Sequence, residues 1–265
     1  MKIDKIVTVF FSPTGTSQKV AQAIASGCGD IPREVIDLTH PGDRAARQLA
    51  PTELAVIAVP VYAGRLPAVA VERLQAITGC GTPAVIVAVY GNRAYEDALL
   101  ELRDIVERAR FFPVAAAAFI GEHSFSNAEL PIGAGRPDSD DLTRAAAFGT
   151  GVVTKLAAMT RIDSDLCPQI PGQRPYKEGM KNLPFTPSLV ADLCSHCGLC
   201  VTTCPTGAVT LEEQVTIAVE QCIFCCSCLK NCPEQALKIT APPILQTQQT
   251  LHDTCSERKE IELFG

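Results

Sequence analysis

Residues 194–205 read CSHCGLCVTTCP, and residues 222–233 read CIFCCSCLKNCP. Both runs space their cysteines as C-x2-C-x2-C-x3-C followed by proline, and the similarity continues from CPTGAVTL in the first run to CPEQALKI in the second. This self-similarity indicates an internal duplication of one small unit. Three thiolates at two-residue intervals on a tight loop can face three corners of one cuboidal cluster, while the fourth points toward another cluster.

The chain has 13 cysteines, and nine of them lie between residues 194 and 232. Because no secretion signal is recognisable, such clustering favours metal binding over a disulfide framework. Structural zinc is the main alternative, but zinc sites usually take paired C-x2-C knuckles separated by a spacer. The triple spacing followed by Cys-Pro therefore favours iron–sulfur clusters over zinc.

Residues from about 192 to 240 resemble the bacterial-type ferredoxin that carries two [4Fe–4S] clusters, a small α+β domain that we place at residues 191–243. The resemblance implies that the ligands of one cluster are Cys194, Cys197, Cys200 and Cys232. It implies that the ligands of the other cluster are Cys222, Cys225, Cys228 and Cys204. Cys226 departs from the pattern, and we expect its side chain to turn away from the iron.

Residues 1–160 alternate between strand and helix patterns. The strand-like runs are KIVTVFF, EVIDL, LAVIAVPVY, PAVIVAVY and FPVAAAAFI, of which EVIDL is the weakest. Four of them are almost continuously apolar, as a parallel sheet covered on both faces requires. The helical stretches between and after them include TSQKVAQAIA, a short DRAARQLA and the amphipathic YEDALLELRDIVERAR. These patterns predict a doubly wound α/β domain with a five-stranded parallel sheet.

Ligands of such sheets bind at the carboxyl ends of the strands. The loop after the first strand, SPTGTS, lacks both the G-x-G-x-x-G and the G-x-x-x-x-G-K-[ST] patterns. Its backbone N–H groups, hydroxyls and following helix could hold a phosphate without a lysine, although such a turn can also be a simple N-cap. The candidate phosphate ligands are Ser12, Thr14, Gly15, Thr16 and Ser17.

The loops after the third and fourth strands, PVYAGRLP and YGNRAYEDALL, hold three of the four tyrosines. These tyrosines either stack on a flat ring or cap the core. Together the three loops resemble those of the flavodoxin family, which binds FMN, although the tryptophan that many flavodoxins stack on the ring is missing. The resemblance implies ring contacts on one side from Pro60, Val61, Tyr62, Ala63, Gly64 and Arg65. On the other side it implies contacts from Tyr90, Gly91, Asn92, Arg93, Tyr95 and Asp97.

The whole chain resembles fused flavodoxin–ferredoxin proteins of anaerobes, through VPVYAGRLP, VYGNRAYEDALLEL, GEHSFS and GRPDSDDL in that order. The leading hypothesis is therefore an electron-transfer protein in which FMN and two [4Fe–4S] clusters exchange electrons, converting between one- and two-electron carriers. One alternative is a ferredoxin-fed flavin reductase with its substrate near His123, Arg93 or Arg65. Another is a subunit that only docks onto a larger oxidoreductase. His123 either donates a proton at the flavin or caps its loop, and the second role is favoured.

Residues 161–190 are rich in proline and predict a semi-rigid connector. Residues 244–265 form a tail that could dock on either domain. A net charge of −6 without a basic cluster argues against nucleic-acid binding, and no apolar run is long enough to span a bilayer. We expect a cytoplasmic protein whose partners are redox proteins. The sequence does not decide whether the protein forms a homodimer.

Overall fold

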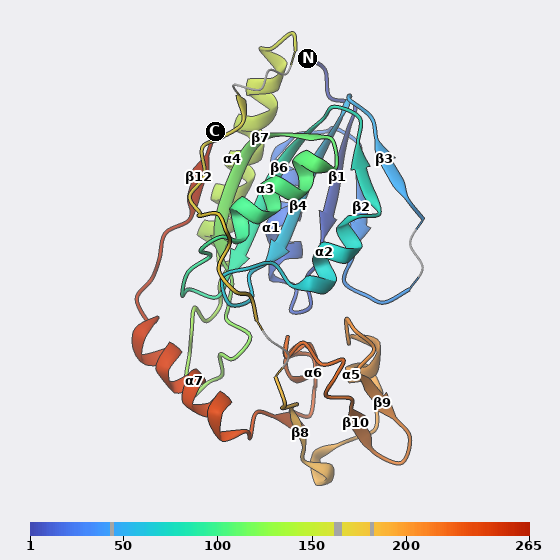
Figure 1. Ribbon diagram of the computed structural model, residues 1–265, viewed down its shortest axis with the longest axis vertical. Coiled ribbons are helices and arrows are strands. Elements are labelled where there is room, and N and C mark those ends of the chain that lie inside the picture. Colours follow the sequence, from blue (N-terminus) through green and yellow to red (C-terminus); the bar gives the residue numbers. More distant parts are fainter. Residues whose placement is uncertain (43–44, 162–165, 181–182) are drawn as a thin grey trace.

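The computed structural model of the protein describes residues 1–42, 45–161, 166–180 and 183–265. Its largest element is a six-stranded sheet in the order β12-β7-β6-β4-β1-β2 (Figure 1). Five of these strands are parallel: β1 (Lys5–Phe10), β2 (Arg33–Asp37), β4 (Glu53–Pro60), β6 (Thr82–Tyr90) and β7 (Phe111–Ile120). Their order corresponds to 2-1-3-4-5, which is the doubly wound order of flavodoxins. The predicted parallel sheet is confirmed.

The sheet is a buried middle layer because its three central strands consist almost entirely of buried residues. Every residue of β4 and β6 is buried, which explains their continuous apolar sequences. Two helices, α1 (Thr16–Gly27) and α4 (Ser139–Ala157), pack together on one face, and α2 (Ala68–Leu74) and α3 (Ala98–Arg108) cover the other (Figure 1).

The prediction of a short helix within DRAARQLA is wrong. Residues Arg47–Leu49 form a short strand, β3, that pairs in parallel with β5 (Ile77–Gly79); residues 43 and 44 lie outside the described residues. The Arg47 guanidinium pairs with Glu34 and Glu53, and the Leu49 side chain is fully buried. These tertiary contacts override the local helix preference, which is weak over so few residues.

Two glycines allow α1 and α4 to approach closely. A Cβ atom added to Gly27 would lie 1.8 Å from the Ala146 carbonyl oxygen, and one added to Gly149 would lie 2.0 Å from the Ile24 carbonyl oxygen. Each glycine thus faces the backbone of the other helix, where no side chain fits. Gly151, only two residues further along α4, is exposed and has open space around it.

We therefore expect opposite effects from two neighbouring substitutions. Gly149→Ala should lower the free energy of unfolding by about 2 kcal/mol, because the helices must separate to admit the methyl group. Gly151→Ala should raise it by roughly 0.5–1 kcal/mol, because alanine is the better helix former. Chemical unfolding followed by circular dichroism measures both. A Gly149→Ala variant as stable as the wild type would contradict the close packing.

The cysteine-rich region forms a small separate unit below the carboxyl ends of the parallel strands (Figure 1). Its elements are β8 (Ser188–Leu189), the 3-10 turn Ala191–Leu193, α5 (Leu199–Thr202), β9 (Val209–Leu211), β10 (Val215–Ile217), α6 (Ser227–Lys230) and β11 (Leu237–Lys238). The ladders β9–β10 and β8–β11 are both antiparallel. Four of the core-forming side chains are aliphatic, namely Ala208, Val209, Val215 and Leu237, and the rest are cysteines.

The C-terminal tail returns to the sheet. Helix α7 (Pro242–Thr254) leads away from the cysteine-rich unit, and β12 (Glu262–Phe264) pairs antiparallel with the outer edge of β7. The Asn92 side-chain amide donates to the carbonyl oxygens of Cys255 and Glu257, at 2.6 and 2.8 Å. The tail therefore links both units, and it covers a sheet edge that would otherwise be open. Among the described residues, no helix is both long and apolar enough to cross a membrane.

Candidate functional site

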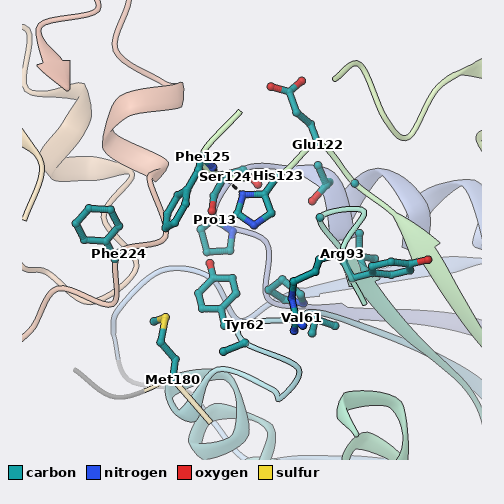
Figure 2. A pocket seen from close by; sticks show the side chains of 18 of the residues that line it. Pro13, Val61, Tyr62, Arg93, Glu122, His123, Ser124, Phe125, Met180 and Phe224 are labelled. Atoms are coloured by element: carbon teal, nitrogen blue, oxygen red, sulfur yellow. Dashed lines mark hydrogen bonds between the residues drawn. The ribbon is translucent and has the colours of Figure 1, made fainter. Parts of the chain in front are cut away.

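A cavity of about 430 Å³ lies where the sheet, the cysteine-rich unit and the tail meet. Figure 2 shows side chains of the sheet loops, of the connector residue Met180 and of Phe224 in the cysteine-rich unit around the same space. The volume lies within the usual range for cofactor and ligand pockets. Twelve predicted site residues line it: Ser12, Thr14, Thr16, Ser17, Pro60, Val61, Tyr62, Ala63, Tyr90, Gly91, Arg93 and His123.

The loop before α1 has several features that an anion-binding loop needs. Gly15 adopts a φ of +82° and is the N-cap residue, yet it supplies no side-chain cap to the helix. Ser12 accepts a hydrogen bond from the Gln18 N–H at 3.0 Å. The Ser17 hydroxyl is fully buried and has no hydrogen-bond partner among the described residues. A simple N-cap would use such a hydroxyl to accept a backbone hydrogen bond. A hydroxyl that lines a cavity at a helix start and has no partner therefore favours phosphate binding over N-capping.

Tyr62 forms the part of the cavity wall that is nearest to the cysteine-rich unit. Its hydroxyl points toward Pro13 across the open space (Figure 2). Burial raises the pKa of Tyr62 well above its usual range, and the adjacent thiols of Cys225 and Cys226 raise it further. The ring is therefore a neutral phenol between the sheet loops and these thiols. It offers a flat, partly apolar surface to a ring-shaped ligand.

Six predicted cofactor contacts lie outside the cavity lining: Gly15, Gly64, Arg65, Asn92, Tyr95 and Asp97. Tyr95 packs on Tyr90 with ring centroids 5.4 Å apart and donates to the Glu262 carboxylate at 2.8 Å. Like Asn92, it anchors the tail. A Cβ atom on Gly64 would lie 1.6 Å from a carboxylate oxygen of Glu96, so this glycine makes room for that side chain.

Two further predicted residues hold the connector rather than the cavity. Both Asp97 oxygens accept backbone N–H groups of the connector, from Gln173 and from Lys177, each at 2.8 Å. The Arg65 guanidinium pairs with Glu101 at 2.8 Å and lies 4.7 Å from the centre of the Tyr176 ring. The connector is thereby fixed along α3, so that its residues Met180 and Leu183 reach the cavity.

His123 lines the cavity as a neutral imidazole. Burial, followed by the nearby positive charges of Lys230 and Arg93, lowers its pKa to about 4. Its Nδ1 accepts the Phe125 N–H at 3.0 Å, which assigns the ring proton to Nε2. A Cβ atom on Gly91 would lie 2.3 Å from the imidazole, so the two residues are packed tightly. At neutral pH the ring can donate one hydrogen bond, but it has no imidazolium proton to give.

We expect the His123 ring to stay neutral at pH 5.5. Nitrogen NMR of the full-length protein, with the signal identified by its loss in His123→Gln, measures this directly. Because the folded state binds this proton less tightly than the unfolded chain, the histidine destabilises the fold as the pH falls from 6.5 toward 4. A ring that titrates near 6.5 would contradict the buried arrangement.

No local sequence pattern predicts the residues that close the cavity on its outer side. They come from the connector, the cysteine-rich unit and α7: Lys177, Met180, Leu183, Phe224, Ile244, Thr247 and Leu251. Phe125 and Phe224 meet edge to face, with ring centroids 5.6 Å apart, beside Tyr62 (Figure 2). Phe224 lies inside the second cysteine run, where its neighbours drew attention to metal binding instead.

Polar contacts fix the cysteine-rich unit on the rim of the sheet. The buried Ser227 hydroxyl donates to the Pro13 carbonyl oxygen at 2.7 Å, next to the candidate phosphate loop. Lys230 pairs with Glu122 at 2.6 Å. On the other side, Arg73 of α2 donates to the Pro205 carbonyl oxygen at 2.6 Å.

The cysteines gather in the two sets that the ferredoxin resemblance implies. One small cavity is lined by the cluster-one cysteines, Cys194, Cys197, Cys200 and Cys232. Another is lined by the cluster-two cysteines, Cys204, Cys222, Cys225 and Cys228, with Cys226 also at its wall. Within the described part of the chain, no three metal-binding side chains are arranged around a single ion. A four-iron cluster makes a different demand, because each thiolate binds a different iron.

Cys226 has contacts of its own. It is almost fully buried, adopts a φ of +59°, and its thiol lies 3.6 Å from the Phe224 carbonyl oxygen. It packs in an apolar group with Phe224 and Ile244. These contacts belong to the wall between the cluster-two cysteines and the large cavity.

The two cysteine sets differ in depth. Of the cluster-two cysteines, Cys204, Cys225 and Cys228 are buried, and this set lies on the side facing Phe224 and Tyr62. Of the cluster-one cysteines, Cys197 is exposed and only Cys200 is buried. The structure thus places one set against the large cavity and the other toward solvent.

Comparison with known proteins matches the cysteine-rich unit to a protein family. A family model described as a 4Fe-4S dicluster domain matches residues 186–233, so this region is an iron–sulfur domain. No curated protein shows significant sequence similarity to the chain.

Solved structures similar to the chain include two flavodoxins. A flavodoxin from the domain Archaea is 14% identical, with 58% of this chain and 99% of that one covered and a TM-score of 0.37. Oxidised flavodoxin 1 from Bacillus cereus is 16% identical, with 57% and 97% covered and a TM-score of 0.40. The flavodiiron core from Synechocystis is 15% identical, with 58% and 36% covered and a TM-score of 0.40. Such TM-scores are too low to support a shared function, so the fold assignment rests on the strand order of this chain.

Proposed function

We propose that this protein transfers electrons between an FMN bound in the large cavity and two [4Fe–4S] clusters in the cysteine-rich unit. One observation carries the proposal: Phe224 lines both the large cavity and the cavity of the cluster-two cysteines, and Tyr62 lies near Cys225 and Cys226. FMN would supply chemistry that accepts one or two electrons, whereas each cluster carries one. The shared wall makes a short path between them.

The chain's own residues have distinct roles in this proposal. Ser12, Thr14, Thr16 and Ser17 would hold the phosphate through hydroxyls and the start of α1, without a cation in the loop. Tyr62 and Phe224 would cover the ring with flat side chains and keep water out. The neutral His123 would donate a hydrogen bond from Nε2. We infer no proton transfer from it at neutral pH.

The reductase alternative receives less support. It placed a substrate near His123, Arg93 or Arg65. Arg65 lies outside the cavity and is paired with Glu101. Arg93 lines the cavity but is paired with Glu96 at 2.8 Å. His123 is neutral, so it has no imidazolium proton to donate to a substrate. Electron transfer needs none of these groups to be free, because it requires only nearby cofactors and an insulating wall.

Anaerobically reconstituted protein should bind one FMN and about eight iron atoms per chain. The Gly15→Ala variant should keep its iron but bind FMN about five- to thirtyfold more weakly. Alanine is strained at this φ by roughly 1–2 kcal/mol, so the free loop relaxes away from the shape that holds the phosphate. Fluorescence titration with FMN measures the affinity, and iron analysis measures the clusters.

Gly29 provides a matched control at the far end of α1. Its φ of +83° is almost the same, and open space surrounds it as well. Gly29→Ala should therefore carry the same backbone strain while its affinity for FMN stays within about twofold of the wild type. Wild-type protein that binds iron but no FMN would overturn the proposed function. Equal FMN affinity in both variants would contradict the role of the loop before α1 in binding the phosphate.

A further inference from the structure

Of the two cysteine sets, the cluster-one set is the one that an external protein would reach more easily. The outer side of the cavity is walled by the connector, Phe224 and α7, so an approaching protein meets these segments first. The cluster-two cysteines are mostly buried behind the same wall. The cluster-one cysteines lie at the surface, and Cys197 is exposed.

The surface around the cluster-one cysteines is apolar at its centre. Leu193, directly before Cys194, is 45% exposed, and Leu199, directly before Cys200, is 40% exposed. They are two of only seven large apolar side chains that are exposed among the described residues. Each of the two leucines directly precedes a cluster-one cysteine, and exposed apolar side chains of this kind are typical of the centre of a transient interface.

The rim of this surface is acidic. Glu234 lines the cluster-one cavity, and Glu213 lies in the β9–β10 turn, where its carbonyl oxygen lies 3.2 Å from the His196 imidazole. Both residues are exposed, and neither carboxylate forms an ion pair with another described residue. Residues 186–241 contain five acidic residues and only two basic ones, and one of the latter, Lys230, is paired with Glu122 of the sheet domain.

We propose that this surface, centred on Leu193 and Leu199 and rimmed by Glu213 and Glu234, is the docking site of a small basic electron-carrier protein. Opposite charge steers a transient partner to the surface, and the two leucines give a desolvated contact over the exposed thiolates. In each encounter one electron would pass between the carrier and the iron–sulfur cluster held by the cluster-one cysteines, and one of the two would be oxidised as the other is reduced. The cluster-two cysteines then face inward, toward the cavity.

The test uses full-length, cluster-loaded protein and cytochrome c as a basic one-electron probe. Oxidised cytochrome c is titrated calorimetrically at low and at high salt, so that binding is measured without turnover. We expect its dissociation constant to rise at least about tenfold in Glu213→Lys/Glu234→Lys. The double variant Asp4→Lys/Asp30→Lys changes the net charge equally at the opposite, amino end of the sheet, and its affinity should stay within about threefold of the wild type.

A kinetic measurement on the same proteins supports the assignment. Dithionite-reduced protein passes one electron from its clusters to each ferric cytochrome c, and the second-order rate should fall by a factor similar to that for binding. Equal losses in both double variants would mean that net charge alone acts, and would overturn the docking site. Unchanged binding in Glu213→Lys/Glu234→Lys would also overturn it.

The inference rests on the proposed function only for the presence of the clusters. If the rim variant behaves as the wild type while FMN and iron are bound, the docking site fails and the proposed function stands. If no FMN binds but the rim variant loses affinity for cytochrome c, the docking site stands without the flavin. Self-association of the wild type that is abolished in the rim variant would assign the surface to a second copy of the chain, and would contradict the proposal.

Discussion

The contact between the cysteine-rich unit and the rim of the sheet is the interaction on which the rest depends. The buried Ser227 hydroxyl binds the Pro13 carbonyl oxygen, and Phe224 packs edge to face on Phe125. Ser227 and Phe224 both lie within the second cysteine run, so docking and cysteine placement are coupled. Without this contact the large cavity would lose one wall. The two units would then be joined only by the connecting segments of the chain. The tail strengthens it, since β12 closes the chain back onto the sheet.

This arrangement places the two cysteine sets and the large cavity in a fixed order between solvent and the sheet. The cluster-one cysteines, of which Cys197 is exposed, the mostly buried cluster-two cysteines and the cavity follow one another from solvent to the sheet. The proposed electron path follows the same order, because electron transfer favours short separations through packed, dry material. A flavodoxin-like domain usually leaves its ligand edge open at the strand ends, whereas this chain covers that edge with three of its own segments.

Patterns local in sequence predicted the sheet, the cysteine sets and the loops around the cavity. Continuous apolar runs predict β4 and β6, and the repeated cysteine spacing predicts two matching sets. Contacts that depend on distant segments could not be predicted in this way. Tyr95 and Asn92 lie in a ring-binding loop by sequence, yet they hold a tail more than 160 residues away. Phe224, Ile244 and Leu251 carry no local signal for a cavity, because only the docked arrangement brings them together.

The most direct test of the shared wall is the kinetic order of electron transfer between the flavin and the clusters. In anaerobic protein loaded with FMN and iron, a laser pulse reduces the flavin, and its reoxidation by the clusters is followed by absorbance. The account predicts a first-order rate that does not change with protein concentration, that is lost in Cys228→Ser and that is retained in Cys226→Ser. A rate that rises in proportion to concentration would show transfer between molecules, and would contradict it.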